Sequence, residues 1–195
     1  MTRRNGGDVA VAPRWRIVSS PGPRAGDTFC LAMDPGPGFG DGTHPTTALC
    51  LQALAALAPR DRPWRMLDFG SGSGILAIGA ARLGATADAV EIDPLAAAHG
   101  ERNARASGVH DRVAHVRTLE GARSSFDFVV GNILRPVLLE FASELVSRMA
   151  PRATLVLSGL VSTDVPEVSM RYAALLGGAR PEIYPRDEWR ALVWR

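Results

Sequence analysis

From about residue 66 to residue 194, the hydrophobic positions of the chain follow two alternating patterns. Short apolar runs are typical of buried strands, and segments with apolar residues three and four positions apart are typical of helices. Strands are predicted just before Asp68 and over 87–90, 112–117, 125–130, 153–158, 182–184 and 189–194. Helices are predicted after Gly74 and over 94–107, 136–149 and 164–176. Strands that alternate with helices in this way predict an α/β domain with a mostly parallel sheet.

The first part of the chain has a weaker pattern. Residues 1–14 are polar, glycine and arginine residues without a period, and they predict a flexible tail. Short strands are predicted over 15–18 and 28–33, with a loop rich in Pro, Gly and Ser between them. We therefore expect a flexible tail and short lead-in over 1–27, followed by a single domain over 28–195.

Length and composition narrow the classes of protein to which this chain can belong. The chain has 195 residues, 46% of them hydrophobic, which is enough for one compact domain with a core. No apolar run reaches the length of about 18 residues that a membrane-spanning helix needs, and the N-terminus has no apolar segment typical of a secretory signal. Cys30 and Cys50 lack a metal-binding spacing, so we expect free thiols, no metal site and a cytoplasmic location.

The basic residues do not indicate a nucleic-acid partner. All 22 of them are arginine, and the net charge is only +2. Nothing in the sequence gathers these arginines into one segment, so we expect them to be scattered over the surface. The sequence therefore predicts no direct contact with nucleic acid or membrane, and we expect a monomer.

A glycine-rich turn, Asp68-Phe69-Gly70-Ser71-Gly72-Ser73-Gly74, joins the first of these strands to its helix. Glycines at alternate positions allow the backbone to approach a ligand closely, and the helix N-terminus that follows suits an anionic group. Glu91 ends the next strand, where its carboxylate can accept hydrogen bonds from both hydroxyls of a ribose. The spacing differs from the dinucleotide pattern G-x-G-x-x-G. A dinucleotide site and a turn with glycines for packing alone stay as alternatives.

The glycine-rich turn, followed by Glu91 about 20 residues later, resembles the S-adenosylmethionine site of class I methyltransferases. The resemblance implies a Rossmann-like, mostly parallel seven-stranded sheet with helices on both faces and an antiparallel strand near the end. Asp93 and Pro94 have the form of a helix start, with Asp93 as the N-cap, which leaves Glu91 free for the ribose. By resemblance, the residues of the turn and second strand that bind the cofactor are Asp68, Gly70, Gly72, Gly74 and Glu91.

A second motif lies in the loop over residues 34–47, which contains four glycines and three prolines. Its stretch Phe39-Gly40-Asp41-Gly42-Thr43-His44-Pro45-Thr46-Thr47 resembles the F-G-T-G-T-H-P-T-T signature of the ribosomal protein L11 methyltransferases, the PrmA family. Asp41 stands where that family has threonine. In the family this loop closes over the cofactor, which implies cofactor contacts from Phe39, Thr43 and Thr47. Thr46 and Thr47 are also suitable helix caps, and we interpret His44 as a residue that shapes the loop.

A third motif, Gly131-Asn132-Ile133-Leu134, follows the strand over 125–130 and resembles the A-N-I-L of the same family. Asn132 is therefore expected at the carboxyl edge of the sheet, where α/β enzymes bind their ligands. The resemblance makes Asn132 the candidate catalytic residue and a cofactor contact. Its amide oxygen and the neighbouring carbonyl oxygens are expected to accept a hydrogen bond from an amine and to aim the nitrogen lone pair at the methyl group. Because no aromatic residue follows to stack on a base, methylation of a flipped nucleobase is disfavoured.

The resemblance covers about residues 28–195 and implies an S-adenosylmethionine-dependent N-methyltransferase that acts on protein amino groups, with ribosomal protein L11 or another protein as substrate. Family members carry an N-terminal domain that presents the ribosomal protein. Only about 27 residues precede the matching part here, so we expect that recognition domain to be absent. Two alternatives remain: a small-molecule biosynthetic methyltransferase, and a non-catalytic module that binds the cofactor or a partner protein.

Overall fold

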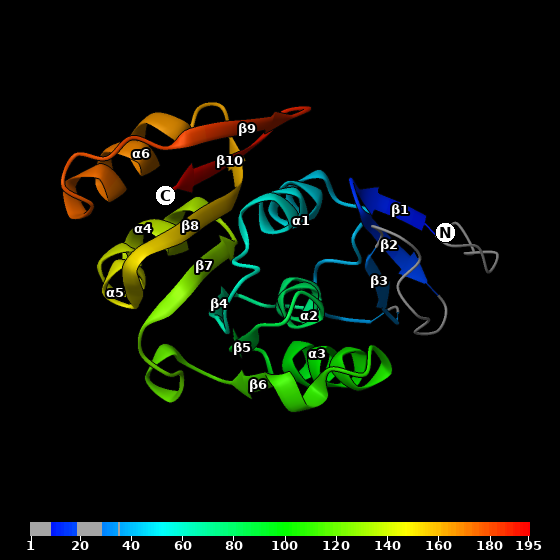
Figure 1. Cartoon of the computed structure of the whole chain (residues 1–195). Coiled ribbons are helices and arrows are strands. Elements are labelled where there is room, and N and C mark those ends of the chain that lie inside the picture. Colours follow the sequence, from blue (N-terminus) through cyan, green and yellow to red (C-terminus); the bar gives the residue numbers. More distant parts are fainter. Residues whose placement is uncertain (1–8, 19–28, 35) are drawn as a thin grey trace.

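The computed structural model describes residues 9–18, 29–34 and 36–195, and its largest element is a seven-stranded sheet (Figure 1). The strand order is β6-β5-β4-β7-β8-β10-β9. Strands β4 to β8 pair in parallel, whereas β10 runs antiparallel to both β8 and β9. The strands are β4 (Arg65–Phe69), β5 (Thr86–Val90), β6 (Val113–Val116), β7 (Phe126–Asn132), β8 (Met149–Val161), β9 (Glu182–Arg186) and β10 (Trp189–Trp194). This confirms the predicted fold class.

Two groups of helices cover the two faces of the sheet (Figure 1). One face carries α1 (Pro45–Leu57), α2 (Ile75–Arg82) and α3 (Pro94–Ala106). The other carries α4 (Arg135–Glu140), α5 (Ala142–Ser147) and α6 (Val165–Leu175). Adjacent residues of the central strands belong to different cores: Phe128 packs on the α1–α3 side and Val129 on the α4–α6 side. Strands buried on both faces explain why the sequence shows continuous apolar runs instead of alternation.

The helix predicted over 136–149 is divided into α4 and α5. Phe141 separates them with φ −89° and ψ 8°, outside the helical region. Hydrogen bonding nevertheless continues, because Phe141 N–H donates to the Val137 carbonyl and Leu145 N–H donates to the Phe141 carbonyl. The Phe141 ring packs against Phe69, with 5.1 Å between ring centroids. Tertiary packing of one aromatic side chain therefore accompanies the break in the predicted helix.

The tail predicted up to residue 14 includes a strand, so that prediction was wrong for residues 9–12. Strands β1 (Val9–Ala12), β2 (Trp15–Val18) and β3 (Phe29–Ala32) form a second, three-stranded sheet beside α1 and α2. Trp15 is fully buried, packs on Phe29 and donates its indole N–H to the Leu51 carbonyl at 2.8 Å. This contact joins the small sheet to the main core. The rest of the predicted tail and loop, 1–8 and 19–28, lies outside the described residues.

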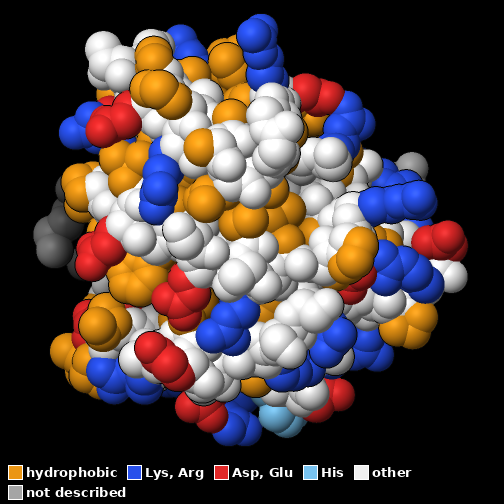
Figure 2. Space-filling model, turned by 90° about the vertical axis from the view of Figure 1, so that its left-hand side faces the viewer, with side chains coloured by type: hydrophobic (Ala, Val, Ile, Leu, Met, Phe, Trp, Pro, Cys, Tyr) orange, Lys and Arg blue, Asp and Glu red, His pale blue; other side chains and the backbone are white. Residues whose placement is uncertain are grey.

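The described surface fits the expectation of scattered charge. Figure 2 shows arginines dispersed over one face, with acidic and uncharged side chains between them. Within the described ranges, no helix is both long and apolar enough to cross a membrane. Cys30 and Cys50 are free thiols, as predicted.

Candidate functional site

The glycine turn between β4 and α2 is held by the end of the neighbouring strand β5. The N–H groups of Gly70 and Ser71 both donate to the Val90 carbonyl at 3.0 Å. The N–H of Gly72 donates to Glu91 Oε2 at 2.9 Å, and the other oxygen of Glu91 accepts the N–H of Asp93 at 3.0 Å. A carboxylate oxygen can accept two hydrogen bonds, so each oxygen of Glu91 keeps one position for a ligand. The turn and the acidic residue predicted from the sequence therefore lie side by side.

Asp68 lies behind the turn and does not line a cavity. Its carboxylate is buried and accepts the N–H of Ala77, in the first turns of α2, at 3.0 Å. Burial raises the pKa of the Asp68 carboxyl from 3.8 to about 7, and the charge of Glu91 adds to this rise. In this structure Asp68 connects β4 to α2, and the cofactor contact predicted for it has no cavity to reach.

The raised pKa of Asp68 leads to a prediction about stability. Between about pH 4 and pH 7, the folded protein holds a proton on Asp68 that the unfolded chain releases, so this residue lowers the free energy of unfolding as the pH rises through that window. Asp68→Asn keeps an oxygen for the Ala77 N–H but does not titrate. Urea unfolding at about pH 4 and about pH 7 is expected to show the wild type losing stability relative to the variant as the pH rises. An equal difference at both pH values would contradict this assignment.

The loop over residues 36–44, called the lid loop below, packs directly on the glycine turn. The N–H of Ser73 donates to the Phe39 carbonyl at 2.8 Å, and the Ser73 hydroxyl donates to the Gly40 carbonyl at 2.6 Å. A Cβ on Gly72 would lie 2.6 Å from the Phe39 carbonyl oxygen. The close approach of the two backbones therefore requires glycine at position 72.

Two side chains of α3 hold the start of this loop. His99 accepts the N–H of Gly38 with Nδ1 at 3.2 Å, and its Nε2 lies 2.8 Å from the Asp34 carbonyl oxygen. Asn103 accepts the Asp34 N–H at 3.0 Å and donates to the Ser73 carbonyl at 2.9 Å. Both side chains are buried, so they satisfy backbone groups that the loop would otherwise leave without partners.

The end of the lid loop is ordered by local hydrogen bonds. Asp41 Oδ1 accepts both the N–H of Thr43, at 2.9 Å, and its hydroxyl, at 2.6 Å. These bonds explain how aspartate is accommodated at a position where the related signature has threonine, and they direct Thr43 away from the cavity. His44 is the N-cap of α1, with Nδ1 as the acceptor of the Thr46 N–H. The cap is thus the histidine, and not one of the two threonines predicted as caps.

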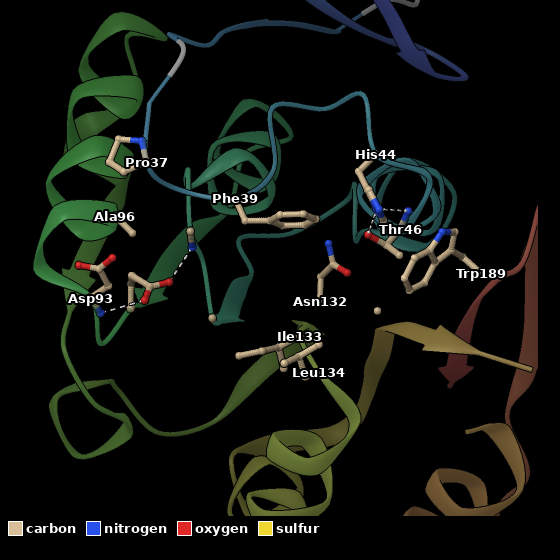
Figure 3. Close-up of a pocket in the computed structure, with 14 residues that line it drawn as sticks. Pro37, Phe39, His44, Thr46, Asp93, Ala96, Asn132, Ile133, Leu134 and Trp189 are labelled. Carbon is tan, nitrogen blue, oxygen red and sulfur yellow. Dashed lines mark hydrogen bonds between the residues drawn. The ribbon is translucent and has the colours of Figure 1, made fainter. Parts of the chain in front are cut away.

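A first cavity of about 410 Å³ opens at the carboxyl edge of the sheet, between the glycine turn and the lid loop. Figure 3 shows Asp93, Ala96 and Pro37 at one end and His44, Thr46 and Trp189 at the other. Phe39 and Asn132 lie between these ends, and Ile133 and Leu134 lie below them in the view. The cavity is long, with acidic side chains at one end and aromatic side chains at the other.

A second cavity, of about 390 Å³, adjoins the first. Gly70, Glu91 and Ile133 line both cavities. The second cavity is bounded mainly by apolar side chains of the α4–α6 core, with a few polar ones: Phe69, Val90, Ile92, Leu119, Val137, Phe141, Arg117, Thr118, Glu120 and Glu140. An elongated ligand can pass from one cavity to the other beside Glu91.

Asn132 ends β7 and lines the first cavity. Its Nδ2 is 3.4 Å from Thr47 Oγ1, whereas its Oδ1 is buried and has no hydrogen-bond partner. An unpartnered buried oxygen is costly and indicates a ligand with a donor group. Thr47 is fully buried and lies behind Asn132, so it positions this side chain.

The structure brings together some of the predicted site residues and separates others. Five of the nine line the first cavity: Phe39, Gly70, Gly72, Glu91 and Asn132. Four do not: Thr43, Thr47, Asp68 and Gly74. Gly74 packs on α3, where a Cβ would lie 3.2 Å from the Cα of Gly100. The sequence patterns did not identify Thr46, Gly159 and Trp189 as lining residues.

Comparison with known proteins shows to which family this chain belongs. The model of the family described as "Ribosomal protein L11 methyltransferase (PrmA)" matches residues 3–195. The chain belongs to the ribosomal protein L11 methyltransferase family. This confirms the family predicted from the three motifs, and it extends the match to the small sheet at the start of the chain.

Relatives and solved structures agree with this assignment. The ribosomal protein L11 methyltransferase of Syntrophotalea carbinolica is 40% identical over 98% of this chain and 62% of its own length. The corresponding protein of Glaesserella parasuis is 40% identical over 92% of the chain and 58% of its own length. The chain thus spans about three fifths of these two relatives. The crystal structure of the ribosomal protein L11 methylase of Lactobacillus delbrueckii subsp. bulgaricus is 27% identical, with a TM-score of 0.82 over 95% of this chain and 96% of that one.

Proposed function

We propose that this chain is an S-adenosylmethionine-dependent N-methyltransferase that acts on amino groups of a protein, as the family name suggests for ribosomal protein L11. The observation that carries the proposal is the buried, unpartnered Oδ1 of Asn132 in a cavity beside the glycine turn. Membership of this methyltransferase family and the shape of the two joined cavities support the cofactor.

The residues around the two cavities fit S-adenosylmethionine. Glu91, where the cavities meet, has an acceptor position free on each oxygen for the ribose hydroxyls. The apolar second cavity suits the flat adenine, with Phe69, Val137 and Phe141 among its walls. The turn at Gly70 and Gly72 leaves room for the amino-acid end of the cofactor in the first cavity. When bound there, the cofactor supplies an activated methyl group on a sulfonium.

Asn132 then orients the acceptor amine. Its Oδ1 accepts an N–H from the amine, which fixes the direction of the nitrogen lone pair in the cavity. Because transfer moves positive charge toward the nitrogen, the same oxygen also stabilises the developing charge. The attacking amine must be neutral, and the largely apolar surroundings of Phe39, Ile133 and Leu134 favour its neutral form. Alignment of two reactants in this way accounts for most of the rate enhancement that we ascribe to the site.

A transfer assay tests this function. The chain is incubated with S-adenosylmethionine labelled in its methyl group, together with recombinant ribosomal protein L11 or with a cell lysate that is then separated into protein and small molecules. We expect acid-stable label in protein, and loss of that label with Asn132→Ala. Label in the small-molecule fraction alone would support a biosynthetic methyltransferase instead. Cofactor binding without any transfer would support a non-catalytic module.

A further inference from the structure

Strand β8 reaches the first cavity directly beside Asn132. Ser158 pairs with Asn132 in the parallel register of β7 and β8, and its carbonyl accepts the Ile133 N–H at 3.3 Å. The next residue, Gly159, lines the cavity and has a φ of +84°. A Cβ there would lie 2.7 Å from the Ile133 carbonyl oxygen, so the close approach of these two segments requires glycine. The backbone that follows Asn132 is therefore held by β8.

The side chain of Ser158 connects β8 to helix α1. It is fully buried, and its hydroxyl donates to the Thr46 carbonyl at 3.3 Å. Thr46 lies in the first turn of α1 and precedes Thr47, whose Oγ1 is 3.4 Å from Asn132 Nδ2. Figure 3 shows Thr46 and Asn132 in the first cavity. Ser158 thus contacts both the residue before Thr47 and the residue after Asn132.

The hydrogen bond between Thr47 and Asn132 leaves little room for movement. Such bonds are usually about 2.7–3.2 Å long, so any further separation of α1 from β7 would break it. Within the described part of the chain it is the one hydrogen bond of the Asn132 side chain, because Oδ1 has no partner. Without it, the amide group is free to turn over and to present its NH₂ to the cavity. That NH₂ would donate to the lone pair with which the acceptor amine attacks.

We propose that Ser158 is a positioning residue, which keeps Asn132 Oδ1 directed at the acceptor by holding the start of α1 at a fixed distance from β7. This inference rests on the proposed function. Ser158 lines neither cavity, so it contacts neither the cofactor nor the acceptor. Its effect on the reaction passes through Thr47 and the orientation of the Asn132 amide.

The first test removes the hydroxyl and keeps the backbone. Ser158→Ala is expected to lower turnover about tenfold, less than the roughly 100-fold that a displacement of about 1 Å can cost. Affinity for S-adenosylhomocysteine is expected to stay within a few-fold. Ser158→Cys retains a weak donor and is expected to recover part of the turnover.

Ser107→Ala is the matched control. The buried Ser107 hydroxyl donates to the Ala32 carbonyl at 3.0 Å, and it joins the end of α3 to β3 away from both cavities. Each alanine variant loses one buried hydrogen bond, so both are expected to show a lower midpoint of thermal unfolding. Turnover is expected to fall only in Ser158→Ala. A loss of turnover of the same size in Ser107→Ala would overturn the inference, because the effect would then follow from stability alone.

A double variant tests whether Ser158 acts through Thr47. Once Thr47→Val has removed the hydroxyl beside Asn132, the further change Ser158→Ala is expected to lower turnover little more. Losses that simply add would overturn the inference, because the two residues would then act independently.

The side-chain amide signal of Asn132 tests the inference without an acceptor. The signal is assigned in an NMR spectrum of the full chain by its absence in Asn132→Asp. We expect Ser158→Ala to shift or broaden it and Ser107→Ala to leave it in place. An unchanged signal in Ser158→Ala would overturn the inference. A wild type that transferred no methyl group would contradict the proposed function, while the amide signal would still test how Asn132 is positioned.

Discussion

Replacement of Gly72 by alanine is expected to lower the affinity for S-adenosylmethionine by about 100-fold or more. The added Cβ would lie 2.6 Å from the carbonyl oxygen of Phe39 and 3.1 Å from its nitrogen. Both are backbone atoms that no rotamer change can move, so the lid loop must leave the glycine turn and lose its hydrogen bond from Ser73. Isothermal titration calorimetry of the purified variant measures this loss.

Gly84→Ala is the matched control for this substitution. Gly84 also has a positive φ, +98°, but no atom lies within 4 Å of the position that its Cβ would take. Alanine there costs only the backbone strain of a left-handed residue, about 1–2 kcal/mol, which lowers the midpoint of thermal unfolding. Affinity for the cofactor is expected to stay within a few-fold. If Gly72→Ala bound as tightly as Gly84→Ala, the contact between lid loop and turn would not matter for binding.

Asn132→Ala is expected to lower turnover by roughly 100-fold to 1,000-fold, the range seen when one group that stabilises transition-state charge is removed. Cofactor affinity should remain within a few-fold, because Glu91 and the second cavity are untouched. We expect turnover to fall and affinity to stay because the unpartnered Oδ1 of Asn132 binds the acceptor amine and not the cofactor. Single-turnover kinetics with labelled S-adenosylmethionine separates the two quantities. Equal losses in affinity and turnover would reassign Asn132 to cofactor binding.

A pair of substitutions at Thr47 tests how Asn132 is positioned. Thr47→Val removes the hydroxyl that accepts from Asn132 Nδ2 at 3.4 Å, and Thr47→Ser retains it. We expect the valine variant to lose part of the turnover rate and the serine variant to keep it, with cofactor affinity nearly constant in both. Equal turnover in the two variants would show that this hydrogen bond does not orient the amide.

Local sequence patterns were sufficient for the parts of the site that one chain segment builds. The glycine turn needs positive φ angles and close backbone approach, and these requirements leave a direct signature in residues 70–74. Glu91 and Asn132 follow predicted strands that end at the same edge of a parallel sheet. Their convergence therefore follows from topology once the strands are recognised.

Long-range packing determines the features of the site and fold that local sequence patterns did not predict. Nothing in the local sequence distinguishes Thr46, which lines the cavity, from Thr47, which is buried behind Asn132, because the rotation of α1 decides it. The contact between His44 and Trp189 joins the lid loop to a strand at the far end of the chain. Asp68 was assigned to the cofactor because it precedes the glycines, yet the fold directs it into the core toward α2. The strand at 9–12 also gains its partner only in the folded sheet.

One calorimetric comparison tests whether the glycine turn and Glu91 form a site for S-adenosylmethionine. The purified chain is titrated with S-adenosylmethionine and, separately, with NADH, which fits the dinucleotide alternative. We expect S-adenosylmethionine to bind at a single site and NADH to give no heat of binding. Binding of NADH alone would contradict this expectation and support the dinucleotide alternative. Binding of neither compound would also contradict it and would make the glycine turn a structural element of the fold.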